Sequence, residues 1–181
     1  MELVPCKVEE RNPEVVWCES YRISRLKGLS PATKSFLFRL IHTLLPSKER
    51  IHHLTREASP LCWGQSGEQE TYQHLFYNCE KNTDAGQALL RCVQSYDHNL
   101  TETRSLRLQI SADEPFLIAS VSILATGLEL IWETRKSKKQ TSLFNMRSEL
   151  EMSISIRRKS SSIALREVAN IMNNMIVNFH Q

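Results

Sequence analysis

Residues 113–139 read DEPFLIASVSILATGLELIWETRKSKK and hold the most regular apolar pattern in the chain. Apolar side chains recur there at steps of three and four residues, the period of an amphipathic α-helix, at Leu117, Val121, Leu124, Leu128 and Ile131. The start is acidic and contains a proline, and the end is basic, as suits the two poles of a helix dipole. Polar residues interrupt the run from Phe116 to Trp132, which falls short of the roughly 20 apolar residues that a bilayer span needs. The stretch predicts a long buried helix in a soluble domain.

Helical spacing also appears on both sides of this stretch and predicts a mainly α fold. The further expected helices cover 31–45, 48–55, 70–78, 84–96, 143–156 and 163–179. In 143–156 the apolar residues also alternate as in a strand, and the helical neighbours favour the helix. Alternation at 106–110 predicts a short strand or an extended crossover. A sandwich or barrel is not expected, because only 5 Gly and 6 Pro are present to make tight turns.

The first two of these helices carry apolar side chains whose burial can be predicted. The stripe of the first runs from Phe36 to Leu44 and includes Phe38, so it is wide enough for burial on more than one side. On the second, Ile51 and Leu54 are expected to face inward.

Composition argues against several classes of protein. Of the 181 residues, 41% are hydrophobic and 24% are charged, close to the globular average, so general disorder is not expected. Asp never occurs as an adjacent pair, which argues against a two-metal polymerase or nuclease built on clustered aspartates. The phosphate-loop, dinucleotide-binding, zinc-protease and nucleophile-elbow motifs do not occur. We therefore expect a protein without enzymatic activity of its own.

The cysteines and the net charge suggest the compartment and the partners. The 5 cysteines are odd in number and irregularly spaced, and the first residues lack the apolar core of a signal peptide. Reduced thiols in an intracellular compartment, nucleus or cytoplasm, are therefore expected. The net charge of +3 permits a polyanionic partner without requiring one.

Cys62, His74 and Cys79 follow one another at spacings suited to a metal site. A His and a Cys about one helical turn apart can bind one tetrahedral zinc together with two cysteines on a preceding loop. Gln65 stands where the second loop cysteine would be, and an amide oxygen is a poor zinc ligand beside a thiolate. The sequence therefore predicts a degenerate zinc-knuckle-like loop at 62–79, with zinc as the metal that would fit. The alternative is that no cofactor binds and that the two cysteines are ordinary buried thiols.

With these residues, the chain resembles the zinc-binding domain that follows the polymerase in reverse transcriptases of LINE-type (non-LTR) retrotransposons. That family's pattern runs K-x-F-L-x-R-L-x-H-x-x-L-P-[ST]-x-x-R-[LI], then C-x-x-C, then E-[ST]-x-x-H-[LF]-F-x-x-C. The matching residues here are Lys34, Phe36, Leu37, Arg39, Leu40, His42, Leu45, Pro46, Ser47, Arg50, Ile51, Cys62, Glu70, Thr71, His74, Leu75, Phe76 and Cys79. The pattern departs at Gln65. The resemblance covers about residues 29–80, and the LELIWETR end of the long helix is similar to sequences further along in these elements.

The resemblance implies a fragment, remnant or co-opted piece of such an element, acting as a non-catalytic nucleic-acid-binding accessory module. RNA or DNA would be held weakly through its phosphates. The expected contacts are the basic residues of the first two helices, Lys34, Arg39, Lys48, Arg50 and Arg56. The alternatives are a helical protein–protein interaction or dimerisation module that uses the helices at 115–135 and 163–179, and an inert retroelement remnant.

Three parts of the chain are expected. Residues 1–15 form a flexible arm, 16–136 the reverse-transcriptase zinc-binding-like helical domain, and 137–181 a basic linker with C-terminal helices that pack on it. No membrane contact is expected. The string Arg157-Arg158-Lys159-Ser160 resembles a basophilic kinase site, although short strings of this kind also occur by chance.

Overall fold

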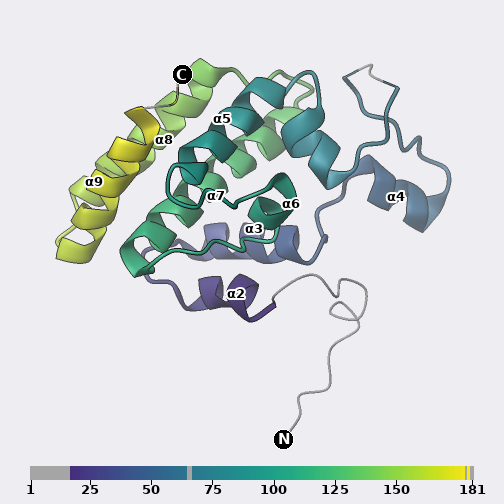
Figure 1. Cartoon of the computed structure of the whole chain (residues 1–181). Coiled ribbons are helices and arrows are strands. Elements are labelled where there is room, and N and C mark those ends of the chain that lie inside the picture. Colours follow the sequence, from purple (N-terminus) through teal and green to yellow (C-terminus); the bar gives the residue numbers. More distant parts are fainter. Residues whose placement is uncertain (1–16, 65–66, 178, 180–181) are drawn as a thin grey trace, which may run out of the picture.

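The computed structural model describes residues 17–64, 67–177 and 179. Within these residues the chain is mainly helical, which confirms the predicted fold class (Figure 1). The helices are α2 (Trp17–Arg22), α3 (Pro31–Ile41), α4 (Lys48–Thr55), α5 (Thr83–Gln94), α6 (Glu102–Leu106), α7 (Glu114–Lys136), α8 (Leu143–Arg158) and α9 (Ile163–Val177), with a 3₁₀ turn η1 (Ile23–Arg25) and a π-turn η2 (His74–Asn78). The expected arm at 1–15 lies outside the described residues.

Helix α7 is the centre of the molecule, as its apolar pattern predicts. It packs against α3, α5, α8, α9 and η2, and α8 and α9 lie side by side against it (Figure 1). Its length and apolar composition would suffice to cross a membrane, yet 72% of its apolar window is buried inside the protein. Leu117 and Leu128 are fully covered. The helix is therefore the core element of a globular fold.

Close approach of α5 to α7 depends on Gly127. A Cβ placed at Gly127 would lie 2.2 Å from Cδ1 of Leu89 on α5, so even a methyl group would overlap the leucine. The missing side chain lets Leu89 insert against the backbone of α7. This contact ties the central helix to the segment that follows η2.

The C-terminal segment folds as two helices, which resolves the ambiguity at 143–156 in favour of the helix. Helix α8 begins at the N-cap Ser142, whose hydroxyl accepts a hydrogen bond from the Asn145 amide at 3.1 Å. On α9, Met172 and Met175 are buried against the core. The alternating apolar residues of α8 divide between the core and the surface, since Ile154 is buried and Ile156 is exposed.

Two expectations about secondary structure differ from the fold. Of the two alternatives for 106–110, the strand does not form within the described residues: α6 runs to Leu106, a turn follows with Leu108 at a positive φ of 55°, and residues 109–113 cross to α7 without regular secondary structure. Helix α3 ends at Ile41 rather than at residue 45, because Thr43 adopts a left-handed φ of 53°. The backbone turns there, which leaves Leu44 exposed outside the helix.

Side-chain burial on α3 and α4 also differs from the expectation. Phe38 is 53% exposed, so α3 is buried on one side only. Helix α4 lies at the edge of the molecule, at the right of Figure 1, and none of its residues is buried. Leu54 is 72% exposed and Ile51 is half-buried, because no neighbouring element covers that face of α4.

Candidate metal centre and nucleic-acid interface

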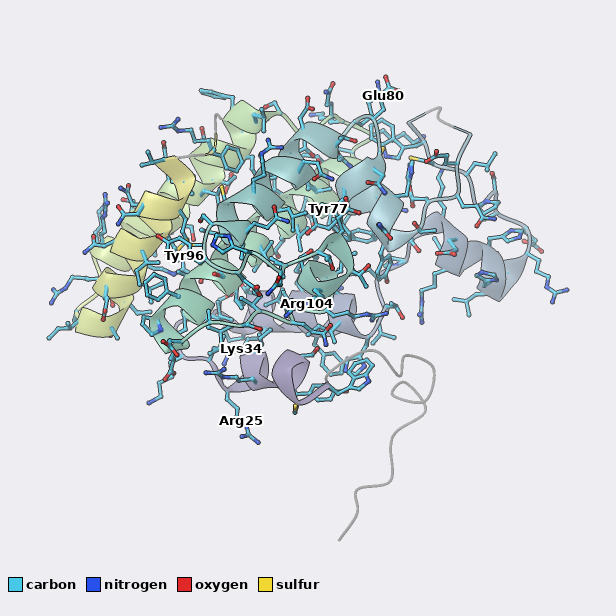
Figure 2. All side chains as sticks on the ribbon, in the orientation of Figure 1. Arg25, Lys34, Tyr77, Glu80, Tyr96 and Arg104 are labelled. Atoms are coloured by element: carbon cyan, nitrogen blue, oxygen red, sulfur yellow. The ribbon has the colours of Figure 1, made fainter. Side chains whose placement is uncertain are left out.

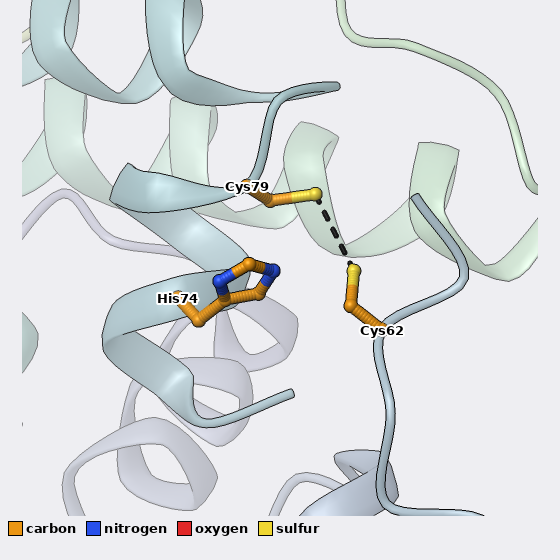
Figure 3. Close-up of side chains that lie close together, drawn as sticks. All are labelled: Cys62, His74 and Cys79. Carbon is orange, nitrogen blue, oxygen red and sulfur yellow. Dashed lines mark hydrogen bonds between the residues drawn. The ribbon is translucent and has the colours of Figure 1, made fainter. Parts of the chain in front are cut away.

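Cys62, His74 and Cys79 come together in the fold, as their spacing predicts. One ligand atom of each residue lies within 4.8 Å of those of the other two, and all three residues are buried. The two sulfurs are 3.5 Å apart. Figure 3 shows the imidazole of His74 and the two thiols pointing toward one another, with Cys62 reaching in from a separate loop.

A short hairpin positions Cys62. Leu61 and Gln69 pair in an isolated antiparallel bridge, and the Cys62 amide donates to the Glu68 carbonyl at 2.8 Å. Within the loop, the Gly64 amide donates to the sulfur of Cys62 at 3.3 Å. A backbone N–H aimed at sulfur stabilises negative charge on that sulfur, as a metal-bound thiolate requires.

The π-turn η2 positions the other two ligands. In an α-helix, residues five apart are rotated by about 140° from one another and face different sides. Here the wider turn brings His74 and Cys79 to one side, and it is closed by a hydrogen bond from the Cys79 amide to the His74 carbonyl at 2.6 Å. Such π-turns are uncommon and are found frequently at functional sites.

The arrangement fits the dimensions of a zinc site. Zinc–sulfur bonds of about 2.3 Å in tetrahedral geometry place two sulfurs about 3.8 Å apart, close to the observed 3.5 Å. A disulfide would need about 2.05 Å, and both cysteines are free. Burial raises the pKa of the Cys79 thiol to about 11, so this cysteine stays a neutral thiol near pH 7 unless a cation draws off its proton.

His74 offers a buried nitrogen that the rest of the protein leaves unused. Neither ring nitrogen makes a hydrogen bond to the described residues. Nδ1 lies 2.7 Å from Oε2 of Glu68, close enough for an ion pair but outside hydrogen-bond geometry. A carboxylate behind one imidazole nitrogen, with the other nitrogen free, is the usual environment of a metal-binding histidine. Three ligands leave one position on the ion; Gln65, the residue in that position of the pattern, lies outside the described residues.

Glu70 has a structural role that the sequence does not reveal. Its fully buried Oε1 accepts hydrogen bonds from the Lys48 amide at 2.8 Å and from Nε of Arg135 at 3.1 Å, and Nη2 of Arg135 also contacts it. Arg135 further donates to the Pro46 carbonyl at 3.3 Å. The pair therefore joins the hairpin, the start of α4 and the end of α7. Arg135 thus has a structural role, because it stabilises the packing of these three segments.

The five basic residues expected to bind phosphates do not form one surface. Lys34 lies between α3 and α2 (Figure 2), and Arg39 is exposed on α3. Lys48 and Arg50 are half-buried near the start of α4, and the exposed Arg56 ends that helix in a left-handed conformation. Sequence spacing shows which basic residues share a helix. It does not show how α3 and α4 are oriented, and in the fold their basic side chains face different directions.

Arg50 alone of these five lines a groove beside α4. The groove has a volume of about 570 Å³ and lies between α4, the start of η2 and α6, where its walls include Arg50, His53, Leu54, Tyr72, Gln73 and Arg107. Nη1 of Arg50 donates to the Thr43 carbonyl at 2.6 Å, and Arg107 donates to the Ile41 carbonyl. Both cations therefore sit at the carbonyl end of α3, where the helix dipole favours positive charge.

Tyr72 and Arg107 are the groove residues that sequence reasoning missed. Tyr72 donates its hydroxyl to the Leu45 carbonyl at 2.7 Å, which fixes the ring in the groove wall. Burial raises the pKa of Tyr72, so the phenol stays neutral. Arg107 appears in the sequence only as a polar residue of an alternating run, and the turn after α6 is what brings it to the groove.

Comparison of this chain with protein-family models, with curated proteins and with solved structures found no match.

Proposed function

We propose that this chain is a non-catalytic nucleic-acid-binding accessory module, of the kind that its sequence resembles in reverse transcriptases of LINE-type retrotransposons. The observation that carries the proposal is the groove between α4 and α6, which combines two arginines with an aromatic side chain next to a cysteine–histidine cluster. Phosphates bind to guanidinium groups, and bases of a single strand stack on aromatic rings.

Arg50 supplies the phosphate contact in this proposal. One of its N–H groups is bonded to the Thr43 carbonyl, and its other guanidinium nitrogens make no hydrogen bond or ion pair to the described residues. The bond to Thr43 holds the side chain in place. A guanidinium that is already positioned loses less conformational entropy on binding than a mobile surface lysine does.

Zinc has a supporting role in the proposal. An ion on Cys62, His74 and Cys79 would link the hairpin to η2, and Tyr72 and Gln73 of the groove wall immediately precede η2. The ion would supply a rigid cross-link between these two segments and no chemistry of its own. Metal binding and nucleic-acid binding are therefore expected to be coupled, with tighter RNA binding when zinc is present.

A titration with single-stranded RNA at two salt concentrations tests the proposal. If the groove contacts about three phosphates, affinity falls about 20-fold between 50 and 200 mM salt. Arg50→Glu lowers both the affinity and the salt slope, for all RNA sequences alike, because phosphate contacts carry no base information. Arg166→Glu, an exposed change of the same charge on α9, is the matched control and leaves binding unchanged. Absence of binding at low salt, or equal losses in both variants, contradicts the proposal.

Protein–protein interaction is the second candidate function, and exposed apolar residues near the α8–α9 turn favour it. Ile156 is 66% exposed and Ile163 is 75% exposed, with Met152 also on the surface. Helix α7 offers no such surface, since its apolar residues are used in the core. Sedimentation at micromolar protein tests this function: self-association that Ile156→Glu abolishes, with no RNA binding at low salt, would favour it over the groove.

A further inference from the structure

Arg157, at the end of α8, is a partly buried cation without an acidic partner. Nη1 donates to the Ser153 carbonyl at 3.1 Å and contacts the Ser153 hydroxyl, and Nη2 donates to the Ser122 hydroxyl at 3.1 Å. Nε is buried and makes no hydrogen bond to the described residues. No ion pair forms between Arg157 and any described carboxylate, and burial alone lowers its pKa. A desolvated charge in this position is costly unless an anion accompanies it.

Residues that carry hydroxyl groups line the cavity beside Arg157. Its volume is about 470 Å³, and these lining residues are Ser30, Thr33, Ser122, Thr126, Ser153 and Ser160. Arg157 is the only charged residue in this lining. Hydroxyls can donate to an anion, and a guanidinium donates in a planar fork, so together they can surround an oxyanion.

Four helices, from three separate regions of the sequence, form this cavity. The start of α3, the middle of α7, the end of α8 and the start of α9 contribute to it, and the α8–α9 turn and the start of α3 both lie toward the left of Figure 1. Gly28 and Leu165 also line the cavity and pack closely together. A Cβ at Gly28 would lie 2.4 Å from Cδ2 of Leu165, so this contact requires a glycine. The positive end of the α3 dipole adds to the attraction for an anion.

We propose that this cavity binds a phosphate group through the guanidinium of Arg157 and the surrounding hydroxyls. A phosphate carries up to two negative charges and strong acceptor oxygens on several sides, which match donors arranged around a cavity better than the single plane of a carboxylate does. The site is separate from the groove between α4 and α6 and does not depend on the proposed function.

The phosphate has two possible sources with the same chemistry. It can belong to a free phosphate-bearing molecule, or it can be attached to Ser160, which is one of the lining residues and follows Arg157-Arg158-Lys159 in the sequence. In the second case the phosphoserine would pair with Arg157 and fix the turn between α8 and α9.

Thermal unfolding in inorganic phosphate tests the first source. At phosphate concentrations ten times the Kd, the Tm of the parent is expected to rise by about 3 to 6 °C over chloride of equal ionic strength. Arg157→Gln abolishes the rise, and the control Arg158→Gln, which removes the exposed neighbouring charge, retains it. Thr126→Val removes one hydroxyl without changing charge or shape, and it lowers phosphate affinity even if Arg157→Gln does not fold.

Phosphorylation of Ser160 by a basophilic kinase tests the second source. The phosphorylated chain is expected to melt at a higher temperature than the parent and to lose its response to added phosphate, whereas Ser160→Ala, which the kinase cannot modify, shows no rise in Tm after the same treatment. A rise from either source supports the cavity. The proposal is overturned if neither source raises the Tm of the parent, or if Arg157→Gln and Thr126→Val respond as the parent does.

Discussion

At the scale of single residues, the buried ion pair of Glu70 and Arg135 gives the clearest prediction of stability. Arg135→Met leaves the Glu70 carboxylate buried without a cation, and we expect a loss of about 3 to 5 kcal/mol in the free energy of unfolding. Urea denaturation measures this loss. Lys136→Met is the matched control, because its ion pair with Glu133 is exposed and contributes less than about 1 kcal/mol. Adding Glu70→Gln to Arg135→Met removes the stranded charge and is expected to recover part of the loss; no recovery would contradict this account.

His42 is expected to make the fold sensitive to mild acid. Its ring lies 4.3 Å from that of Phe38 and 5.9 Å from that of Trp17, and burial, together with the charge of Arg107, lowers its pKa below the usual 6.5. The unfolded chain therefore takes up a proton near pH 6.5 before the folded chain does, so stability falls as the pH drops from 7 through the lowered folded pKa.

Denaturation at pH 7 and pH 5 measures this effect. His42→Phe keeps a ring in the aromatic cluster and is expected to reduce the fall in stability between the two pH values. His98→Gln, at an exposed position, is the control and should leave the fall unchanged. An identical pH dependence in parent and His42→Phe would show that other groups cause it.

At this scale, the sequence predicts only those residues of the candidate site that lie close to one another along the chain. Cys62, His74 and Cys79 were identified because metal ligands obey spacing rules, and the fold brings them together. Arg135 and Glu70 lie 65 residues apart, and no local sequence pattern in either segment indicates that they form an ion pair. The same limit explains why Arg107 was not expected in the groove.

At the scale of elements, the contact of α5 with η2 depends on one glycine. A Cβ at Gly86 would lie 2.0 Å from the carbonyl oxygen of Phe76, which is backbone and cannot move without shifting the π-turn. We expect Gly86→Ala to cost about 1 to 3 kcal/mol of stability and to weaken zinc binding, because η2 contains His74 and ends directly before Cys79. Arg91→Ala, exposed on the same helix, is the control for both measurements. Unchanged zinc affinity in Gly86→Ala would show that η2 does not need this packing.

Gln65 stands in the fourth ligand position of the sequence pattern, so a cysteine there is expected to complete the metal site. Gln65→Cys is expected to supply a third thiolate, so that zinc at 100 times its Kd raises the Tm by about 5 to 10 °C, compared with little change in the parent. Ser66→Cys, which adds a thiol one residue later, is the control. Melting with zinc and with chelator measures the shift. A parent that already holds one tight zinc would show that three protein ligands are sufficient.

Predictions of elements succeeded where an apolar period was long and failed where a turn intervened. Helices α7 and α9 follow repeats that extend over several turns. The alternation at 106–110 was too short to distinguish a strand from a helix end followed by a turn. The inward face expected for α4 failed for another reason: its pattern is helical, but no other element covers it.

At the scale of the whole molecule, the central position of α7 predicts that a polar change on its buried side destabilises the entire domain. Leu117 is buried where α7 meets the rest of the core, and Leu117→Asp places an unpaired charge there. We expect a loss of more than about 4 kcal/mol, a large fraction of the roughly 5 to 15 kcal/mol by which native domains are stable. Circular dichroism during thermal unfolding measures it. Glu114→Asp, an exposed change in the first turn of the same helix, is the control and should melt as the parent does. If Leu117→Asp also keeps the Tm of the parent, the apolar side of α7 that includes Leu117 is not part of the core.

The same central helix has a consequence for synthesis of the protein on the ribosome. When Lys136 has emerged from the ribosome, α8 and α9 have not yet emerged to cover α7. Translation of Ser137 to Val177 takes about 2 to 8 s, and during that time a helix long and apolar enough to enter a membrane is partly uncovered. The nascent chain is therefore expected to bind a chaperone in this interval, and the packing of α8 and α9 on α7 to release it.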